Sequence, residues 1–226
     1  MTATDTLTHR ADEQRVGVLL DDLLERFPPE STDPVTFLGE QFDRGLAWVH
    51  FDVGCGGLGL SPTLQRMINE RTSAAGAPNP NYRNPIGYGM CGPTVAVWGS
   101  DEQKHRYLRP LFTGEEIWCQ LFSEPGSGSD FAGLSATGIR DGEEWICNGQ
   151  KVWTTLAHLS KWGLLIVRTD PQAVKHAGLT AFVVDMEDPT VEIRPLRQMT
   201  GEAEFNEVFF SDTRINESEM LGKPGD

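Results

Sequence analysis

The spacing of apolar residues changes once along this chain, near residue 116, and this change limits the folds open to it. From Val16 to Phe27, apolar side chains recur at i, i+3, i+4 and i+7, which is one face of a helix. From Ile117 onward the period is two, and Asp141-Gly142 and Asn148-Gly149 interrupt the apolar runs. Such pairs tolerate a positive φ and are typical of hairpin turns. The sequence therefore predicts helices first and a meander of short strands afterwards.

The predicted fold class is α+β, with an α-helical domain over residues 1–116 and a β domain over residues 117–226. Asp33-Pro34, Ser61-Pro62 and Ser100 each offer an oxygen that can cap the first turn of a helix. Regularly spaced short strands indicate a barrel or a sandwich. The strands are expected at residues 134–140, 143–147, 150–155, 162–168, 179–185, 191–195 and 205–211.

Charge and composition exclude several functions. The chain has 19 Lys and Arg against 33 Asp and Glu, a net charge of −14, so it lacks the basic surface that nucleic acid or a polybasic membrane anchor requires. No apolar run approaches the roughly 18 residues of a membrane-spanning helix. The polar start shows no signal peptide, and the four cysteines lack the spacing of a zinc site. We expect a cytoplasmic protein with reduced, mostly buried thiols and no bound metal.

Residues 54–59, Gly-Cys-Gly-Gly-Leu-Gly, match the spacing of a dinucleotide-binding loop. Such a loop must follow a strand and open the helix of a βαβ unit. Here helices are predicted on both sides, and Pro62 opens the next one. We therefore interpret residues 54–59 as a flexible glycine loop rather than a nucleotide site.

Two later segments carry more chemistry. Residues 123–130, Ser-Glu-Pro-Gly-Ser-Gly-Ser-Asp, follow a predicted strand, and their backbone amides could receive a phosphate or a flavin edge, or could belong to a solvated turn. Strand alternation places Trp153 on the same face as Lys151 and Thr155. There the indole could stack on an aromatic cofactor or pack in the core. The carboxylate of Glu124 is interpreted as a solvated turn charge.

Together, the segments Leu-Phe-Ser-Glu-Pro-Gly-Ser-Gly-Ser-Asp at 121–130 and Asn-Gly-Gln-Lys-Val-Trp-Thr-Thr at 148–155 resemble the two signatures of the acyl-CoA dehydrogenase family. Segments at 99–115 and 205–222 are also similar to that family. Two signatures at the family's spacing are far more specific than a single motif. The resemblance implies an α-helical N-terminal domain, an antiparallel β-barrel middle domain and FAD bound at their edge.

The resemblance also implies FAD contacts from both signatures. Trp153 is expected to pack on the flavin, and Thr154 and Thr155 are expected to contact its edge. Ser129 is expected to touch the CoA arm of the substrate as well as the cofactor. In and just before the first signature, the residues that would line the isoalloxazine, partly through backbone groups, are Gln120, Leu121, Phe122 and Ser123. The residues that would approach the pyrophosphate are Gly128 and Ser129.

The family oxidises an acyl-CoA thioester to trans-2-enoyl-CoA and passes the electrons to an electron-transfer flavoprotein. The resemblance implies that this chain supplies the flavin- and CoA-binding half of such an enzyme, within a homo- or hetero-oligomer. The family's general base lies in a further helical domain that this sequence does not contain, so no catalytic residue is named. Two alternatives stay open: a non-catalytic truncated homologue that binds a CoA ester or a partner subunit, and an acyl-CoA oxidase on the same fold.

Overall fold

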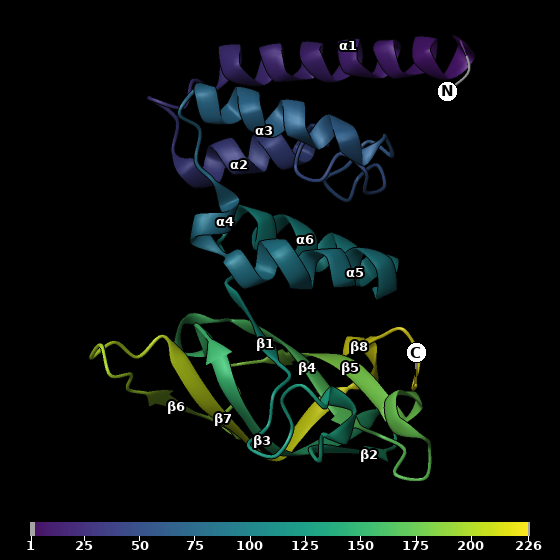
Figure 1. Cartoon of the computed structure of the whole chain (residues 1–226), viewed down its shortest axis with the longest axis vertical. Coiled ribbons are helices and arrows are strands. Elements are labelled where there is room, and N and C mark those ends of the chain that lie inside the picture. Colours follow the sequence, from purple (N-terminus) through teal and green to yellow (C-terminus); the bar gives the residue numbers. More distant parts are fainter. Residues whose placement is uncertain (1–2, 226) are drawn as a thin grey trace. The chain divides into compact units, whose positions relative to one another are not determined.

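The computed structural model describes residues 3–225, with side chains from Thr8 onward. Two compact units make up this part of the chain (Figure 1). The division expected near residue 116 stays a prediction. The first unit consists of the residues up to Pro85 together with Lys104–Glu115, and the second consists of Ile86–Gln103 together with the chain from Glu116 onward.

Helices begin where the sequence offers a cap. The Asp33 carboxylate accepts a hydrogen bond from the Thr36 amide at 3.0 Å, and the Ser61 hydroxyl accepts one from the Thr63 amide at 3.4 Å, which confirms both predicted starts. No helix of the described chain has the length and apolar character needed to cross a membrane. The helices are α1 Ala3–Arg26, α2 Pro34–Asp43, α3 Gln65–Ala74, α4 Pro80–Arg83, α5 Gly92–Trp98 and α6 Asp101–Thr113, with short turns at Pro62–Leu64, Gly87–Cys91, Phe131–Gly133, Ala157–Leu159, Lys175–Gly178 and Glu217–Glu219.

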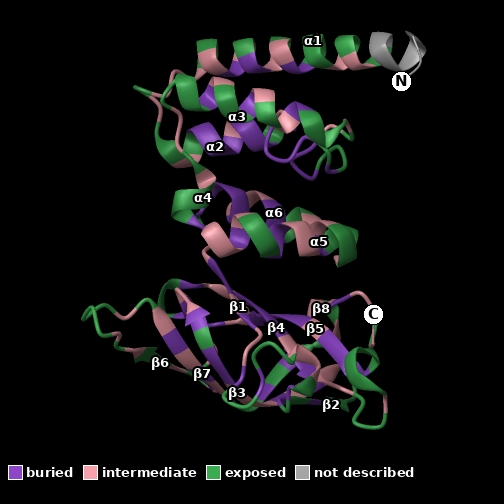
Figure 2. Ribbon diagram, in the orientation of Figure 1, coloured by how far each residue is buried: buried purple, intermediate pink, exposed green. Residues whose placement is uncertain are grey.

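Apolar faces hold the helices of the first unit together. The face predicted for the first helix is the one that α1 buries, and buried residues follow one side of this helix (Figure 2). Removing these side chains from water is the main force that stabilises the unit. The buried apolar residues of this core include Val16, Leu20, Leu23, Phe37, Leu38, Leu46, Val49, Ile68, Leu108, Leu111 and Phe112.

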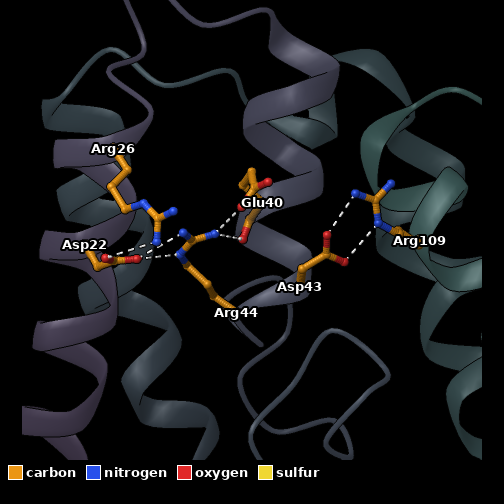
Figure 3. Close-up of polar contacts among 6 residues, drawn as sticks. All are labelled: Asp22, Arg26, Glu40, Asp43, Arg44 and Arg109. Carbon is orange, nitrogen blue, oxygen red and sulfur yellow. Dashed lines mark hydrogen bonds and ion pairs between the residues drawn. The ribbon is translucent and has the colours of Figure 1, made fainter.

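Two arginines add directed contacts between these helices (Figure 3). Arg44 reaches Asp22 of α1 at 2.9 Å and also pairs with Glu40 of α2. Arg109 of α6 makes a two-pronged contact with Asp43 of α2, with both N–O distances at 2.9 Å. A planar guanidinium suits this bidentate geometry, so each pair fixes the angle between two helices as well as their spacing.

The glycine loop at residues 54–59 packs tightly within the first unit. A Cβ at Gly57 would lie 2.1 Å from the carbonyl oxygen of Phe51 and 2.6 Å from that of Trp48. The carbonyl of Gly56 accepts a hydrogen bond from the Trp48 amide at 3.0 Å. These glycines let two stretches of backbone approach closely. The centre of the loop is therefore a packing element, which corrects the flexible loop that we expected there, whereas Gly54 and Gly59 at its ends face open space.

The second unit is built on an eight-stranded sheet whose strands run in the order β6-β7-β3-β2-β4-β5-β8, with β1 paired to β4 (Figure 1). Most pairs are antiparallel, but β1–β4 and the single β2–β4 contact are parallel. The strands are β1 Trp118–Leu121, β2 Thr137–Asp141, β3 Glu144–Thr155, β4 Trp162–Arg168, β5 Leu179–Asp185, β6 Val191–Leu196, β7 Phe205–Asn216 and β8 Met220–Leu221.

This sheet corrects the expected antiparallel barrel. Within residues 3–225 the outer strands β6 and β8 do not pair with each other, so the sheet is mostly antiparallel and is not a closed barrel. Closure requires that every strand pairs on both sides. A period of two predicts which face of a strand is buried, but it leaves the choice of partner strand open.

The two expected hairpin turns have different outcomes. Asp141-Gly142 joins β2 to β3 with a positive φ of 68° at Gly142, which confirms the turn. Asn148-Gly149 lies inside the continuous strand β3, where the register with β7 shifts between Cys147 and Gly149. A Cβ at Gly149 would lie 2.5 Å from that of Ala136, so the glycine allows close approach at a bulge. The predicted second turn is therefore wrong.

The sheet packs around an apolar core that includes two of the four cysteines, Cys119 and Cys147. Burial raises the pKa of the Cys119 and Cys147 thiols to about 12, so both stay protonated and inert near neutral pH. All four cysteine side chains are buried, as the sequence predicted. Members of this core include Cys119, Leu121, Trp145, Cys147, Leu165, Val167, Phe182, Val184, Val208, Phe210 and Ile215.

Candidate functional site

The fold brings the two signature segments side by side in the second unit. The first signature leaves β1 at Leu121, and the second forms the end of β3. The Val152 amide donates a hydrogen bond to the Ser123 carbonyl at 2.8 Å, and Lys151 Nζ donates to the Phe122 carbonyl at 3.2 Å. Segments that are about 28 residues apart in sequence are therefore bonded side by side near the end of β3.

Trp153 lies exposed near the end of β3. Its φ is 60°, and the register between β3 and β7 shifts between Lys151 and Thr154, which is a bulge. The bulge breaks the expected alternation: Lys151 is fully buried, whereas Trp153 is 60% exposed. Its ring meets that of Phe205 edge to face, with the centroids 6.1 Å apart. Of the two interpretations left open, the core tryptophan is wrong, because more than half of the side chain is exposed and can receive a planar ligand.

Two of the predicted site residues, Thr154 and Gln120, hold buried polar atoms that no described residue satisfies. Thr154 is 1% exposed, and its Oγ1 has no hydrogen-bond partner among the described residues. The side-chain oxygen of Gln120 on β1 is likewise buried and unpartnered within residues 3–225. Buried polar atoms are rarely left in this state, and such atoms at a site are commonly completed by a ligand or water. The Thr154 carbonyl is fixed by the fully buried Asn206, whose Nδ2 donates to it at 2.9 Å.

The loop of the first signature presents open backbone. Gly128 and Ser129 are exposed, and no atom of the described chain lies within 4 Å of a Cβ built at Gly128. At the start of this loop, the backbones of Glu124 and Ser127 form two reciprocal hydrogen bonds, at 2.8 and 3.0 Å, which hold a tight turn. A ligand can therefore approach the Gly128 backbone directly, as an anion-binding loop requires.

Leu121 stands apart from the other predicted site residues. Its side chain is fully buried in the core of the sheet, and its backbone pairs with Leu165 of β4. Only backbone groups of Leu121 are thus available to a ligand. Phe122, in contrast, is partly exposed and packs on Phe131 with the ring centroids 5.5 Å apart. The nine FAD contacts remain predictions.

The main feature that sequence reasoning missed is a buried ion pair. Lys151 Nζ lies 2.9 Å from Glu124 Oε1, and the two side chains are 0% and 4% exposed. The carboxylate also accepts hydrogen bonds from the Ser135 amide at 2.6 Å, the Ser135 hydroxyl at 2.7 Å and the Ala136 amide at 2.9 Å. Glu124 is therefore not the solvated turn charge that we expected.

These contacts set the protonation of the pair. Burial alone would raise the pKa of the Glu124 carboxyl, but the hydrogen bonds from Lys151, Ser135 and Ala136 outweigh it and hold this pKa below its ordinary value. Burial lowers the pKa of the Lys151 ammonium, and the contact with Glu124 opposes that decrease. A signal was present in the sequence: a lysine beside apolar residues in a strand needs a carboxylate partner if it is buried, and Glu124 lies in the other signature segment.

Comparison with known proteins adds a second line of evidence. Residues 22–115 match the family model described as "Acyl-CoA dehydrogenase, N-terminal domain". Residues 119–213 match the model described as "Acyl-CoA dehydrogenase, middle domain". The two matches are consecutive and cover most of the sequence, including both signature segments.

Individual relatives agree with these models. The Mycobacterium tuberculosis acyl-CoA dehydrogenase IpdE1 is 44% identical over 182 residues, which is 80% of this chain and 47% of that protein. Acyl-CoA dehydrogenase FadE34 of the same organism is 42% identical over 184 residues, which is 81% of this chain and 25% of that protein. This chain therefore spans half or less of the length of these curated relatives.

Solved structures show the same fold. The ChsE4–ChsE5 complex from Mycobacterium tuberculosis matches with a TM-score of 0.67 and 26% identity, covering 100% of this chain and 57% of that one. An acyl-CoA dehydrogenase from Geobacillus kaustophilus matches with a TM-score of 0.66 and 26% identity, covering 100% of this chain and 60% of that one.

Proposed function

Because the chain belongs to the acyl-CoA dehydrogenase family, we propose that it supplies the flavin- and CoA-binding half of an FAD-dependent enzyme that oxidises an acyl-CoA thioester to trans-2-enoyl-CoA. The observation that carries this proposal is the direct joining of the two signatures by the bond from the Val152 amide to the Ser123 carbonyl. Trp153, whose indole is exposed, directly follows Val152, and Ser123 precedes the loop that exposes the Gly128 backbone. A ring-binding surface joined to a phosphate-binding loop is what a dinucleotide flavin needs.

The residues of this candidate site fit FAD. The exposed face of Trp153 would pack on the ring system, and the unpartnered oxygens of Gln120 and Thr154 offer hydrogen bonds to a polar ligand. Gly128 and Ser129 would receive the pyrophosphate, and Ser129 would also meet the CoA arm. The chemistry that FAD supplies when bound is acceptance of the hydride that leaves the β-carbon. The chain's own residues bind and orient the reactants and exclude water from one face of the ring.

We assign removal of the α-proton to no residue of this sequence. Glu124 is the buried carboxylate of the site, and its oxygens are already engaged by Lys151, Ser135 and Ala136. A carboxylate held in this way is a poor base, because accepting a proton would break contacts that favour its charged form. An electron-transfer flavoprotein as electron acceptor, an oligomeric enzyme and a cytoplasmic location belong to the same proposal.

Titration of the purified chain with FAD, followed by the visible flavin spectrum and by tryptophan fluorescence, tests the proposal. We expect binding with a perturbed flavin spectrum and a further spectral change when an acyl-CoA is added. Trp153→Ala should weaken FAD binding roughly tenfold or more, because stacking on an aromatic ring is lost. Trp98→Ala is the matched control, since Trp98 is a 50% exposed tryptophan of the same unit outside the signatures.

The outcomes separate the candidate functions. Absence of flavin binding, or equal binding by the Trp153→Ala variant and the wild type, overturns the proposed flavin site. Binding of CoA esters without any flavin binding favours the non-catalytic module. If the flavin binds and is bleached by acyl-CoA, the speed of its reoxidation by oxygen distinguishes an oxidase from a dehydrogenase that requires a protein acceptor.

A further inference from the structure

The loop at residues 125–133 is closed at its base by the side chain of one residue, Glu124. Glu124 directly precedes the loop, and its carboxylate accepts hydrogen bonds from Ser135 and Ala136, which lie just beyond the end of the loop. Arg168 of β4 holds the far side of the loop by donating to the Ala132 carbonyl at 2.6 Å. The loop therefore starts and finishes at neighbouring points, and its exposed tip carries Gly128.

Lys151 connects this base to the strand that carries Trp153. Its ammonium donates to Glu124 at 2.9 Å and to the Phe122 carbonyl at 3.2 Å, and it is fully buried. Lys151 is two residues from Trp153 along β3. The Lys151 side chain thus contacts Glu124, just before the loop, and Phe122, two residues earlier, while its backbone lies two residues from Trp153 on the same strand.

Stability alone does not account for a charged pair at this position. Taking two charges out of water is costly, and an apolar pair of similar size often gives equal or greater stability. A charged pair with four further directed contacts fixes relative positions more tightly than apolar packing does. The contacts therefore point to a geometric task rather than to a purely stabilising one.

We propose that Glu124 and Lys151 act as a positioning pair that holds the 125–133 loop at a set distance and orientation from Trp153, so that the phosphates and the ring of one flavin dinucleotide are received together. This inference rests on the proposed function. It assigns Glu124 and Lys151 no contact with the ligand, because both side chains are buried beneath the surface that the loop and the indole present. Their effect passes through the loop backbone.

Comparison of two ligands, FAD and riboflavin, tests the pair, because riboflavin has the ring but no phosphate. Lys151→Met should weaken FAD binding roughly tenfold, since the freed loop must then be ordered on binding, and should leave riboflavin affinity nearly unchanged. Lys161→Met is the matched control: Lys161 also pairs with two carboxylates in the same unit, Asp185 and Glu187, but it is partly exposed. The control should bind both ligands like the wild type.

A milder variant keeps the test valid if Lys151→Met does not fold. Ser135→Ala removes only the exposed hydroxyl that donates to Glu124 at 2.7 Å, and it should reduce FAD affinity by a smaller factor in the same selective manner. Equal losses of FAD and riboflavin affinity, or no loss of either, would show that the pair is merely structural.

Hydrogen exchange separates failure of this inference from failure of the proposed function. If the wild type binds neither ligand, the proposed flavin site is wrong, yet the pair still makes a prediction about the loop. Amides of residues 125–133 should exchange faster in Lys151→Met or Ser135→Ala than in Lys161→Met, because local opening follows the loss of contacts at the base of the loop. Unchanged exchange in that segment would overturn the positioning role directly.

Discussion

Replacing Glu124 with Gln should lower the free energy of unfolding of this chain by about 3–5 kcal/mol, the usual cost of leaving one member of a buried ion pair without its partner. The ammonium of Lys151 is fully buried, and after the change it keeps the Phe122 carbonyl, 3.2 Å away, as an acceptor. A neutral amide cannot balance its charge. The cost arises from the stranded charge rather than from lost packing, because Gln and Glu are nearly the same size.

Replacing the other member of the pair, Lys151, should lower the free energy of unfolding by less. In Lys151→Met the carboxylate of Glu124 keeps three hydrogen bonds, from the Ser135 amide and hydroxyl and from the Ala136 amide. We expect a loss of about 2–3 kcal/mol, because these donors compensate for part of the missing ammonium. The double variant has no buried charge, so it should be more stable than Glu124→Gln alone.

Urea denaturation followed by tryptophan fluorescence measures all four members of this cycle, with Lys161→Met as a control that should lose less than about 1 kcal/mol. The indoles of Trp118 and Trp145 are buried in the second unit and report its unfolding. Additive effects of the two single substitutions, or a loss below about 1 kcal/mol for Glu124→Gln, would refute the reasoning.

Three further substitutions and one change of pH have effects on stability whose sign follows from the structure. Gly57→Ala should lower the free energy of unfolding by at least about 1–3 kcal/mol, because the new Cβ would lie 2.1 Å from a backbone oxygen. Gly17→Ala, in an open position on α1, should raise it by about 0.5–1 kcal/mol in the same denaturation assay. Thr154→Val should raise the free energy of unfolding by roughly 1 kcal/mol, because it removes a buried hydroxyl that has no partner among the described residues. If that hydroxyl contacts FAD, the affinity for FAD falls at the same time. Folding lowers the pKa of the Glu124 carboxyl, so the stabilising effect of this carboxylate is present above its pKa in the unfolded chain and is lost as the pH falls through its pKa in the folded chain. The difference in free energy of unfolding between wild type and Glu124→Gln should therefore shrink below about pH 4. A constant difference down to about pH 2 would contradict this.

Local signals in the sequence predicted local structure well. Asp33 and Ser61 cap helices as expected, and Ser100 forms a reciprocal cap with Gln103, in which the Gln103 amide donates to the hydroxyl at 3.2 Å. Each of these depends on residues within one turn of each other. The pairing of strands in the sheet does not depend on such nearby residues. β3 pairs with β7, so Glu144 lies opposite Asn216, and no period or turn residue encodes that choice.

The site shows the same division between local and distant causes. The resemblance identified both signature segments, and they do lie side by side. The exposure of Trp153 was open from the sequence because it depends on a bulge against β7, which interrupts the alternation of side chains. Glu124 was misread because a carboxylate in a turn is normally solvated, and the lysine that reverses this lies 27 residues further along the chain.

Two glycine-rich stretches show how structure settles what a motif cannot. The match at residues 54–59 has the spacing of a nucleotide loop, yet a Cβ at Gly57 would collide with backbone, so that glycine exists to let the chain pack. Gly126 and Gly128, in a stretch with no standard nucleotide spacing, face open space within the described chain. Gly54 and Gly59 also face open space, so an open glycine does not by itself mark a ligand loop. What favours the later loop as the phosphate-binding candidate is that Ser123, just before it, is bonded to the second signature, and substitutions at Gly128 should affect ligand affinity far more than stability.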